Sequence, residues 1–388
     1  MKRIWKISCI ICIMSVLLTG CTAKSIGWIS DTDTKTTEET PVQKAERLLA
    51  SMRLEEKIYQ LFMVRPEDLT GVGVAVQAGE VTQKALETYP VGGIIYFSQN
   101  VKDREQLKQM IENTKAYAKI PLWIGVDEEG GRVARLGNAG IGVAVHPPMG
   151  EVGERGNPEE AREIGAVLAE DLKALGFNLN FAPVADVLTV ENNQDIGNRS
   201  FGRDPAVVSK MVAAEVEGMQ AGGVSATLKH FPSNGSTAAN THHGYGACTR
   251  TLEEMRAAEF LPFRAGIDAG ADLVMVAHMA AVNVTGSQTP STLSKRIVTD
   301  LLRGELGFEK VIVSDALNMG AITEKYTPGD AAVKAIEAGI DLLLMSPDFP
   351  AAAEAIGQKV AEGTLSEERI DESVRRILTL KIERGIIS

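Results

Sequence analysis

The chain has 388 residues, a formal net charge of -11 and 44% hydrophobic residues. This negative charge argues against a nucleic acid or an anionic membrane surface as a binding partner, but it is compatible with a neutral substrate. Of the four cysteines, Cys248 alone lies beyond residue 21, so the sequence excludes an intramolecular disulfide in the remainder of the chain.

The N-terminus has the pattern of an export signal. A short basic stretch precedes an apolar run of 12 residues, and Leu-Thr-Gly-Cys at positions 18–21 matches the lipobox of bacterial lipoproteins. The apolar run is shorter than the about 20 residues that a membrane-spanning helix requires. An uncleaved signal anchor is the alternative. We predict a signal peptide over residues 1–20, lipidation of Cys21 and an extracytoplasmic location, with the lipid anchor as the contact to the cell membrane.

The segment that follows the signal peptide is polar. Residues 21–40 are rich in threonine and poor in large apolar side chains, so they cannot bury enough surface to fold and should form a flexible tether. Residues 41–388 are enough for one large barrel domain or for two smaller domains. With no disulfide available, this body must be stabilised by its core. We predict that it is a single catalytic domain.

Short apolar runs alternate with longer amphipathic stretches along the body. Each run is continuously apolar and rich in β-branched residues, as a strand buried on both faces should be. The eight runs cover residues 60–64, 93–97, 122–126, 179–184, 226–228, 273–277, 311–313 and 342–345.

Helical patterns lie between these runs. The stretch 159–175 follows Asn157-Pro158, a capping residue and a proline suited to the first helical position. The stretch 252–269 follows a capping box from Thr251 to Glu254, and residues 366–384 form a last helix. Eight strands alternating with helices predict an α/β fold, a single (β/α)8 TIM barrel. A doubly wound open sheet is the alternative.

Polar residues follow the apolar runs where a barrel enzyme has its active site. They are Asp127, Asp186, Lys229-His230, His278 and Asp315. Each one alone is compatible with a structural ion pair. Barrel strands do not need ionisable groups at these ends for packing, and burying them unpaired is unfavourable. Several of them, from separate strands, therefore predict a site at one rim of the barrel.

Four segments together resemble family 3 glycoside hydrolases. They are DEEGGRVAR at 127–135, NRSFG at 198–202, KHFP at 229–232 and SDAL at 314–317. Their order and spacing are similar to those of the single-domain bacterial β-N-acetylglucosaminidases, over nearly all of the chain from about Leu54. The resemblance implies a retaining double displacement with a covalent glycosyl-enzyme.

The resemblance also implies roles for single residues. Asp315 of the SDAL segment matches the family nucleophile. The positions that hold sugar hydroxyls are matched by Asp127, Arg135, Arg199, Lys229 and His230, although Arg132 competes with Arg135 for its role. This fits their chemistry, because a carboxylate accepts hydroxyl hydrogen bonds while Lys and Arg donate them. The expected partner is a carbohydrate that contains N-acetylglucosamine. We expect a monomer, no metal and no cofactor.

The acid/base position carries a departure from the family pattern. His242 matches the histidine that these enzymes carry on a mobile loop after the fifth strand, whereas His243 beside it has no assigned role. Asn240 stands where the family has the aspartate that orients this histidine. An amide can hydrogen-bond a ring nitrogen but supplies no charge to stabilise an imidazolium. Ser233-Asn234 also replaces the Gly-His that relatives often carry.

Several alternatives follow from these departures. A β-glucosidase or β-xylosidase of the same family would need an acid/base that this chain does not obviously supply. A phosphorylase is possible because a histidine acid/base does not repel phosphate as a carboxylate does. Asn240 favours a third alternative, a non-catalytic lipoprotein that binds muropeptides. The sequence contains no HExxH or paired-cysteine motif of a metal hydrolase and no GxSxG elbow of a serine hydrolase.

Overall fold

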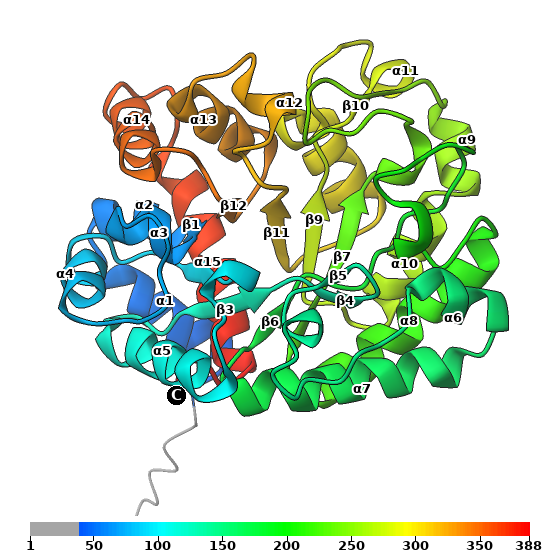
Figure 1. Ribbon diagram of the computed structural model, residues 1–388. Helices are drawn as coiled ribbons and strands as arrows, with labels where there is room; N and C mark the ends of the chain where they lie inside the picture. Colours follow the sequence, from blue (N-terminus) through cyan, green and yellow to red (C-terminus); the bar gives the residue numbers. More distant parts are fainter. Residues whose placement is uncertain (1–38) are drawn as a thin grey trace, which may run out of the picture. The chain divides into compact units, whose positions relative to one another are not determined.

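A computed structural model describes residues 39–388, and the predicted signal peptide, Cys21 and nearly all of the predicted tether lie outside the described residues. Eight parallel strands form the central sheet (Figure 1). They are β1 (Phe62–Val64), β2 (Gly93–Ile95), β3 (Trp123–Val126), β6 (Leu179–Asn180), β7 (Ser225–Phe231), β9 (Leu273–Val276), β11 (Val311–Ser314) and β12 (Leu343–Leu344). Each of the eight predicted apolar runs contains or overlaps one of them.

The sheet closes into a barrel. Its strand order follows the chain from β1 to β11, with β12 beside β1 at the other edge. A parallel bridge between Val313 and Leu342 then joins the two ends of the sheet. This confirms the predicted (β/α)8 barrel. It excludes the doubly wound alternative, in which the strand order reverses at a switch point.

Helices surround the barrel (Figure 1). Those before β7 are α1 (Pro41–Ala50), α2 (Leu54–Gln60), α3 (Pro66–Thr70), α4 (Glu80–Thr88), α5 (Arg104–Tyr117), α6 (Met149–Arg155), α7 (Pro158–Leu175) and α8 (Pro205–Ala221). Those after it are α9 (Leu252–Ala257), α10 (Phe260–Asp268), α11 (Val282–Thr285), a π-type helix (Arg296–Glu305), α12 (Gly320–Thr323), α13 (Pro328–Ala338), α14 (Phe349–Ala361) and α15 (Glu367–Glu383). Among the helices of residues 39–388, none has the length and apolar character needed to span a membrane.

The predicted helix ends are largely confirmed. Asn157 caps α7 with its side chain, and Thr251 and Glu254 form the expected capping box at α9. The expected continuous helix over 252–269 is wrong, because the chain leaves helical geometry at Ala258 and resumes in α10. Pro262 explains the break, since a proline lacks the N–H and its ring clashes with the carbonyl four residues earlier, here that of Ala258.

Three connections build the rim beyond the strand ends, and two of them contain short paired strands. The chain after β3 forms a small antiparallel hairpin, β4 (Glu128–Gly130) with β5 (Val133–Ala134). The chain after β7 enters the loop 232–246 and then β8 (Ala247–Cys248), which pairs with β10 (Ala280–Ala281). The chain after β11 runs through residues 315–319 into α12. These connections carry most of the polar side chains described next.

Candidate active site

A pocket of about 490 Å³ opens at the C-terminal ends of the barrel strands. Its wall contains seven of the eight predicted catalytic and sugar-binding residues, namely Asp127, Arg135, Arg199, Lys229, His230, His242 and Asp315. The eighth, Asn240, does not line the pocket. The structure therefore brings together side chains that are separated by up to 188 positions in the sequence.

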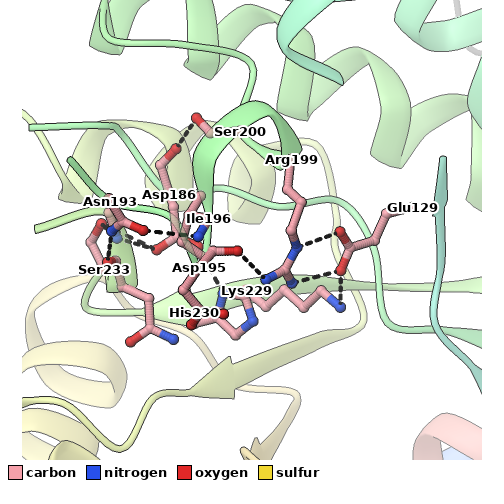
Figure 2. A network of polar contacts seen from close by, with 12 residues as sticks. Glu129, Asp186, Asn193, Asp195, Ile196, Arg199, Ser200, Lys229, His230 and Ser233 are labelled. Carbon is pink, nitrogen blue, oxygen red and sulfur yellow. Dashed lines mark hydrogen bonds and ion pairs between the residues drawn. The ribbon is translucent and has the colours of Figure 1, made fainter. Parts of the chain in front are cut away.

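Lys229 and Arg199 share one buried carboxylate. Lys229 Nζ lies 2.6 Å from Glu129 Oε1 and 2.8 Å from Asp127 Oδ1. Arg199 donates from Nε and Nη2 to the two oxygens of Glu129, each at 2.8 Å. Figure 2 shows both cations converging on Glu129 from different segments of the chain. The side chains of Glu129 and Lys229 are only 1% and 2% exposed, so this network fixes their positions away from bulk water.

Glu129 and Arg199 hold each other in their charged forms. Burial opposes ionisation of Glu129, but the adjacent Arg199 and Lys229 hold the pKa of its carboxyl well below the ordinary range. Burial also opposes the charge of Arg199, yet Glu129 raises the pKa of this guanidinium above its ordinary value. Both groups therefore stay charged across the physiological pH range, and the cations present fixed N–H donors to the pocket.

His230 is oriented by a buried aspartate. Asp186 Oδ2 lies 2.7 Å from His230 Nδ1, and Asp186 Oδ1 accepts hydrogen bonds from the Ser233 hydroxyl and the Gly235 amide. Because the carboxylate accepts a hydrogen bond from the Nδ1–H group, the other ring nitrogen of His230 faces away from Asp186. His230 lines the pocket, so this pair gives the ring a defined orientation for contact with a ligand.

The segment between β3 and α6 is held by Glu128. Its carboxylate accepts the backbone N–H groups of Leu136 and Gly137 at 2.8 and 2.9 Å. Burial raises the pKa of Glu128 to about 7, while these two N–H groups act in the opposite direction. Gly131 has φ +56°, and a side chain there would meet Pro148 at 2.9 Å, which explains the second glycine of the motif.

Arg135 lies beside Asp127 at the edge of the pocket. Its Nη2 lies 3.6 Å from Asp127 Oδ2, and its guanidinium lies 5.4 Å from the Phe97 ring centroid. Arg132 also lines the pocket, but it donates to the backbone carbonyls of Gln194 and Asp195. The contact with Asp127 favours Arg135 over Arg132 for the predicted role.

Asp315 has one restrained oxygen. Its Oδ1 accepts the backbone N–H of Ala316 at 2.8 Å, and among the described residues its Oδ2 accepts no hydrogen bond. His278 stabilises this peptide, because its Nε2 donates to the Ala316 carbonyl at 2.9 Å. Burial opposes ionisation, but His278, His230 and the Ala316 N–H hold the pKa of Asp315 below its ordinary value. The group is thus an ionised, oriented carboxylate with one oxygen available to a ligand.

His242 shares the pocket with Asp315. Among the described residues no hydrogen bond joins Asn240 to the His242 ring, and Asn240 Oδ1 instead accepts the backbone N–H of His242 at 2.9 Å. The backbone carbonyl of Asn240 also accepts the N–H of His243 at 3.1 Å. Asn240 therefore stabilises the turn that carries the histidine, and the charge that an aspartate would bring is missing.

Sequence reasoning missed several residues of this site. Glu129 was part of a named segment, but its role as the shared partner of Lys229 and Arg199 was not predicted. Asp186 and His278 were noted at strand ends without a role. The signal for Glu129 was present, since three acidic residues follow one buried strand and such charges need partners.

Comparison with known proteins identifies the family. The glycosyl hydrolase family 3 N-terminal domain matches residues 53–380. The chain belongs to glycoside hydrolase family 3. A beta-hexosaminidase of Stenotrophomonas maltophilia is 38% identical over 269 residues, which cover 67% of this chain and 77% of that protein. Beta-hexosaminidase A of Pseudoalteromonas piscicida is 30% identical over 89% of this chain.

A solved structure agrees with this assignment. The family 3 beta-N-acetylglucosaminidase from a Paenibacillus species superposes on 87% of this chain with a TM-score of 0.81 and 38% sequence identity. The chain spans 63% of that protein and 62% of the Pseudoalteromonas relative.

The charges around the pocket of this family 3 chain balance. The carboxylates are Asp127, Glu129, Asp195 and Asp315, and the permanent cations are Arg132, Arg135, Arg199 and Lys229. Fixed donors and acceptors with no large net charge suit a neutral ligand that is rich in hydroxyl groups.

Proposed function

We propose that the chain is a retaining exo-β-N-acetylglucosaminidase that hydrolyses terminal β-linked N-acetylglucosamine from peptidoglycan fragments or related oligosaccharides. The observation that carries this proposal is the shared pocket of Asp315 and His242. In this proposal the ionised carboxylate and the imidazole are the two groups that a double displacement requires, and the charged side chains around them bind the sugar hydroxyls. The names of the family 3 relatives support the 2-acetamido sugar.

Asp315 acts as the nucleophile in this proposal. Its free Oδ2 attacks the anomeric carbon, and the bond from that carbon to the leaving oxygen breaks as His242 protonates this oxygen. The product is a glycosyl ester on Asp315 and a free aglycone. His242, now neutral, removes a proton from water, whose oxygen attacks the same carbon and releases the sugar and the carboxylate. Two inversions retain the β configuration.

The network around Lys229 holds the sugar. Asp127 accepts sugar hydroxyls, while Lys229 and Arg199 donate to them from positions that Glu129 fixes. Arg135 and His230 complete the ring of donors and acceptors. Because these groups are already oriented and buried, little reorganisation is needed when the substrate binds.

The test is hydrolysis of nitrophenyl β-glycosides by the detergent-solubilised full-length protein. We expect turnover of the N-acetylglucosaminide in preference to the glucoside, strong loss in Asp315→Ala and His242→Ala, and retention in the matched control His243→Ala. Preference for the glucoside would contradict the specificity. Binding of N-acetylglucosamine oligosaccharides without turnover would indicate the non-catalytic binding protein, and formation of sugar 1-phosphate in phosphate buffer would indicate a phosphorylase.

We also propose that the protein is exported and anchored to the membrane through a lipid on Cys21, as the lipobox indicates. The expected result is that the wild-type protein sediments with membranes and that Cys21→Ser prevents lipidation, measured by the mass of the N-terminal peptide. An N-terminal peptide that begins at Met1, or an unmodified Cys21 in the wild type, would contradict this proposal.

A further inference from the structure

The loop that carries His242 is bound by backbone hydrogen bonds to the segment that follows Asp315. The N–H of Gly320 donates to the carbonyl of His242, and the N–H of Ala321 donates to that of Thr241, both at 3.2 Å. Gly320 and Ala321 are the first residues of α12. Asp315 and His242 are therefore connected through a few residues of backbone, although they are far apart in the sequence.

Side chains extend this contact along the loop. Lys325 Nζ lies 4.5 Å from the centroid of the Tyr245 ring, a cation–π geometry. A side chain at Gly320 would meet the Gly244 nitrogen at 3.0 Å and the His242 carbonyl oxygen at 3.1 Å. The two backbones thus lie close enough that a side chain at position 320 would require one of them to shift. We refer to the contacts between residues 241–245 and 320–325 as the loop–α12 contact.

The base of the loop has its own anchors. Asn193 Nδ2 donates to the carbonyls of Asn234 and Thr237 at 2.6 and 2.8 Å. Between base and tip, Asn240 binds the backbone N–H of His242 and not its ring. The ring position therefore depends on where the loop backbone lies, and the loop–α12 contact sets that position at the end nearer Asp315.

We propose that Gly320, Lys325 and Tyr245 are positioning residues that hold His242 against the pocket through the loop–α12 contact. This inference rests on the proposed function, because it assigns His242 the role of proton donor to the leaving group. In this chain the contact restrains a histidine that lacks a charged orienting partner at position 240.

The experiment compares substrates with different leaving groups. Departure of dinitrophenolate needs almost no proton, whereas departure of methylumbelliferone benefits from an acid. We expect Lys325→Ala to lower kcat/KM for the methylumbelliferyl N-acetylglucosaminide by about two- to fivefold, the scale of an exposed cation–π contact. Gly320→Ala, which displaces the loop backbone, should lower it by about tenfold or more. Both should change the dinitrophenyl substrate less.

Two controls separate positioning from folding. Lys325→Arg keeps a cation over the ring and should restore activity, whereas Lys334→Ala removes an exposed lysine of α13 and should change nothing. Gly320→Ala introduces a better helix former at a helix start, so the variant should fold. Hydrogen exchange in the full-length protein should be faster at the Gly320 and Ala321 amides of Lys325→Ala than in the wild type.

The outcomes distinguish this inference from the proposed function. Equal losses for both leaving groups, or activity in Gly320→Ala and Lys325→Ala equal to the wild type, would overturn the positioning role while the function stands. A wild-type protein that hydrolyses neither substrate would overturn both. Losses that follow the leaving group, with rescue by Lys325→Arg, would establish the role.

Discussion

The buried carboxylate of Glu129 offers the clearest test of how the site is built. Glu129→Gln keeps the shape of the side chain but removes the charge that Lys229 and Arg199 share. Breaking a buried ion pair by removing one partner destabilises a protein by about 3–5 kcal/mol. Lys229 keeps Asp127 as a partner, so we expect the lower end, about 3 kcal/mol. With about 2.1 cal/mol/K per residue over roughly 350 residues, the melting temperature should fall by about 4 °C.

Activity should fall together with stability. The two cations lose the carboxylate that fixes them. A hydrogen bond to a charged group contributes about 1.5–3 kcal/mol, which corresponds to about 10- to 150-fold in kcat/KM. The measurements are thermal unfolding and nitrophenyl N-acetylglucosaminide hydrolysis. Glu159→Gln is the matched control, because Glu159 pairs with Arg162 on the surface at 68% exposure and should matter little. A Glu129→Gln variant as stable and active as this control would refute the reasoning.

Two further predictions concern single substitutions, one that adds a carboxylate and one that removes a buried carboxyl group. In Asn240→Asp, the new carboxylate can still accept the His242 backbone N–H and adds a negative charge near the imidazole. We therefore expect kcat to rise by about tenfold in steady-state assays. An unchanged or lower kcat would show that the missing charge does not limit the rate. Burial raises the pKa of Glu215 to about 8, so folding favours its neutral form, and stability should fall as pH rises from about 4.5 to about 8. Glu215→Gln should reduce this fall by roughly 5 kcal/mol in denaturant unfolding. An identical pH dependence in both proteins would contradict the prediction.

The barrel was predictable because its signals are local. Each strand is a short apolar run, and the caps at Asn157 and Thr251 depend on residues within one turn. The break at Ala258 was also encoded locally, by Pro262, but the amphipathic pattern across it was continuous. Strand ends gave the location of the site, since a parallel barrel brings all of them to one rim.

The partners within the site were not predictable in the same way. That Lys229 lies between Asp127 and Glu129, and that Arg199 reaches the same carboxylate, depends on side-chain directions that only the folded barrel defines. The role of Asn240 depends on the backbone of its own turn. The sequence marked it as a departure from the family pattern, but its contact with the His242 amide could be seen only in three dimensions.

The most direct test of the central claim is to trap the covalent intermediate. A fluorinated N-acetylglucosaminide with a dinitrophenyl leaving group should form the ester quickly and hydrolyse it slowly, because the fluorine destabilises both oxocarbenium-like transition states. After incubation with the full-length protein and proteolysis, we predict a mass increase of one fluorinated sugar on the peptide that contains Asp315, and none in Asp315→Ala. Release of dinitrophenol without a label, or a label on another carboxylate, would contradict the account.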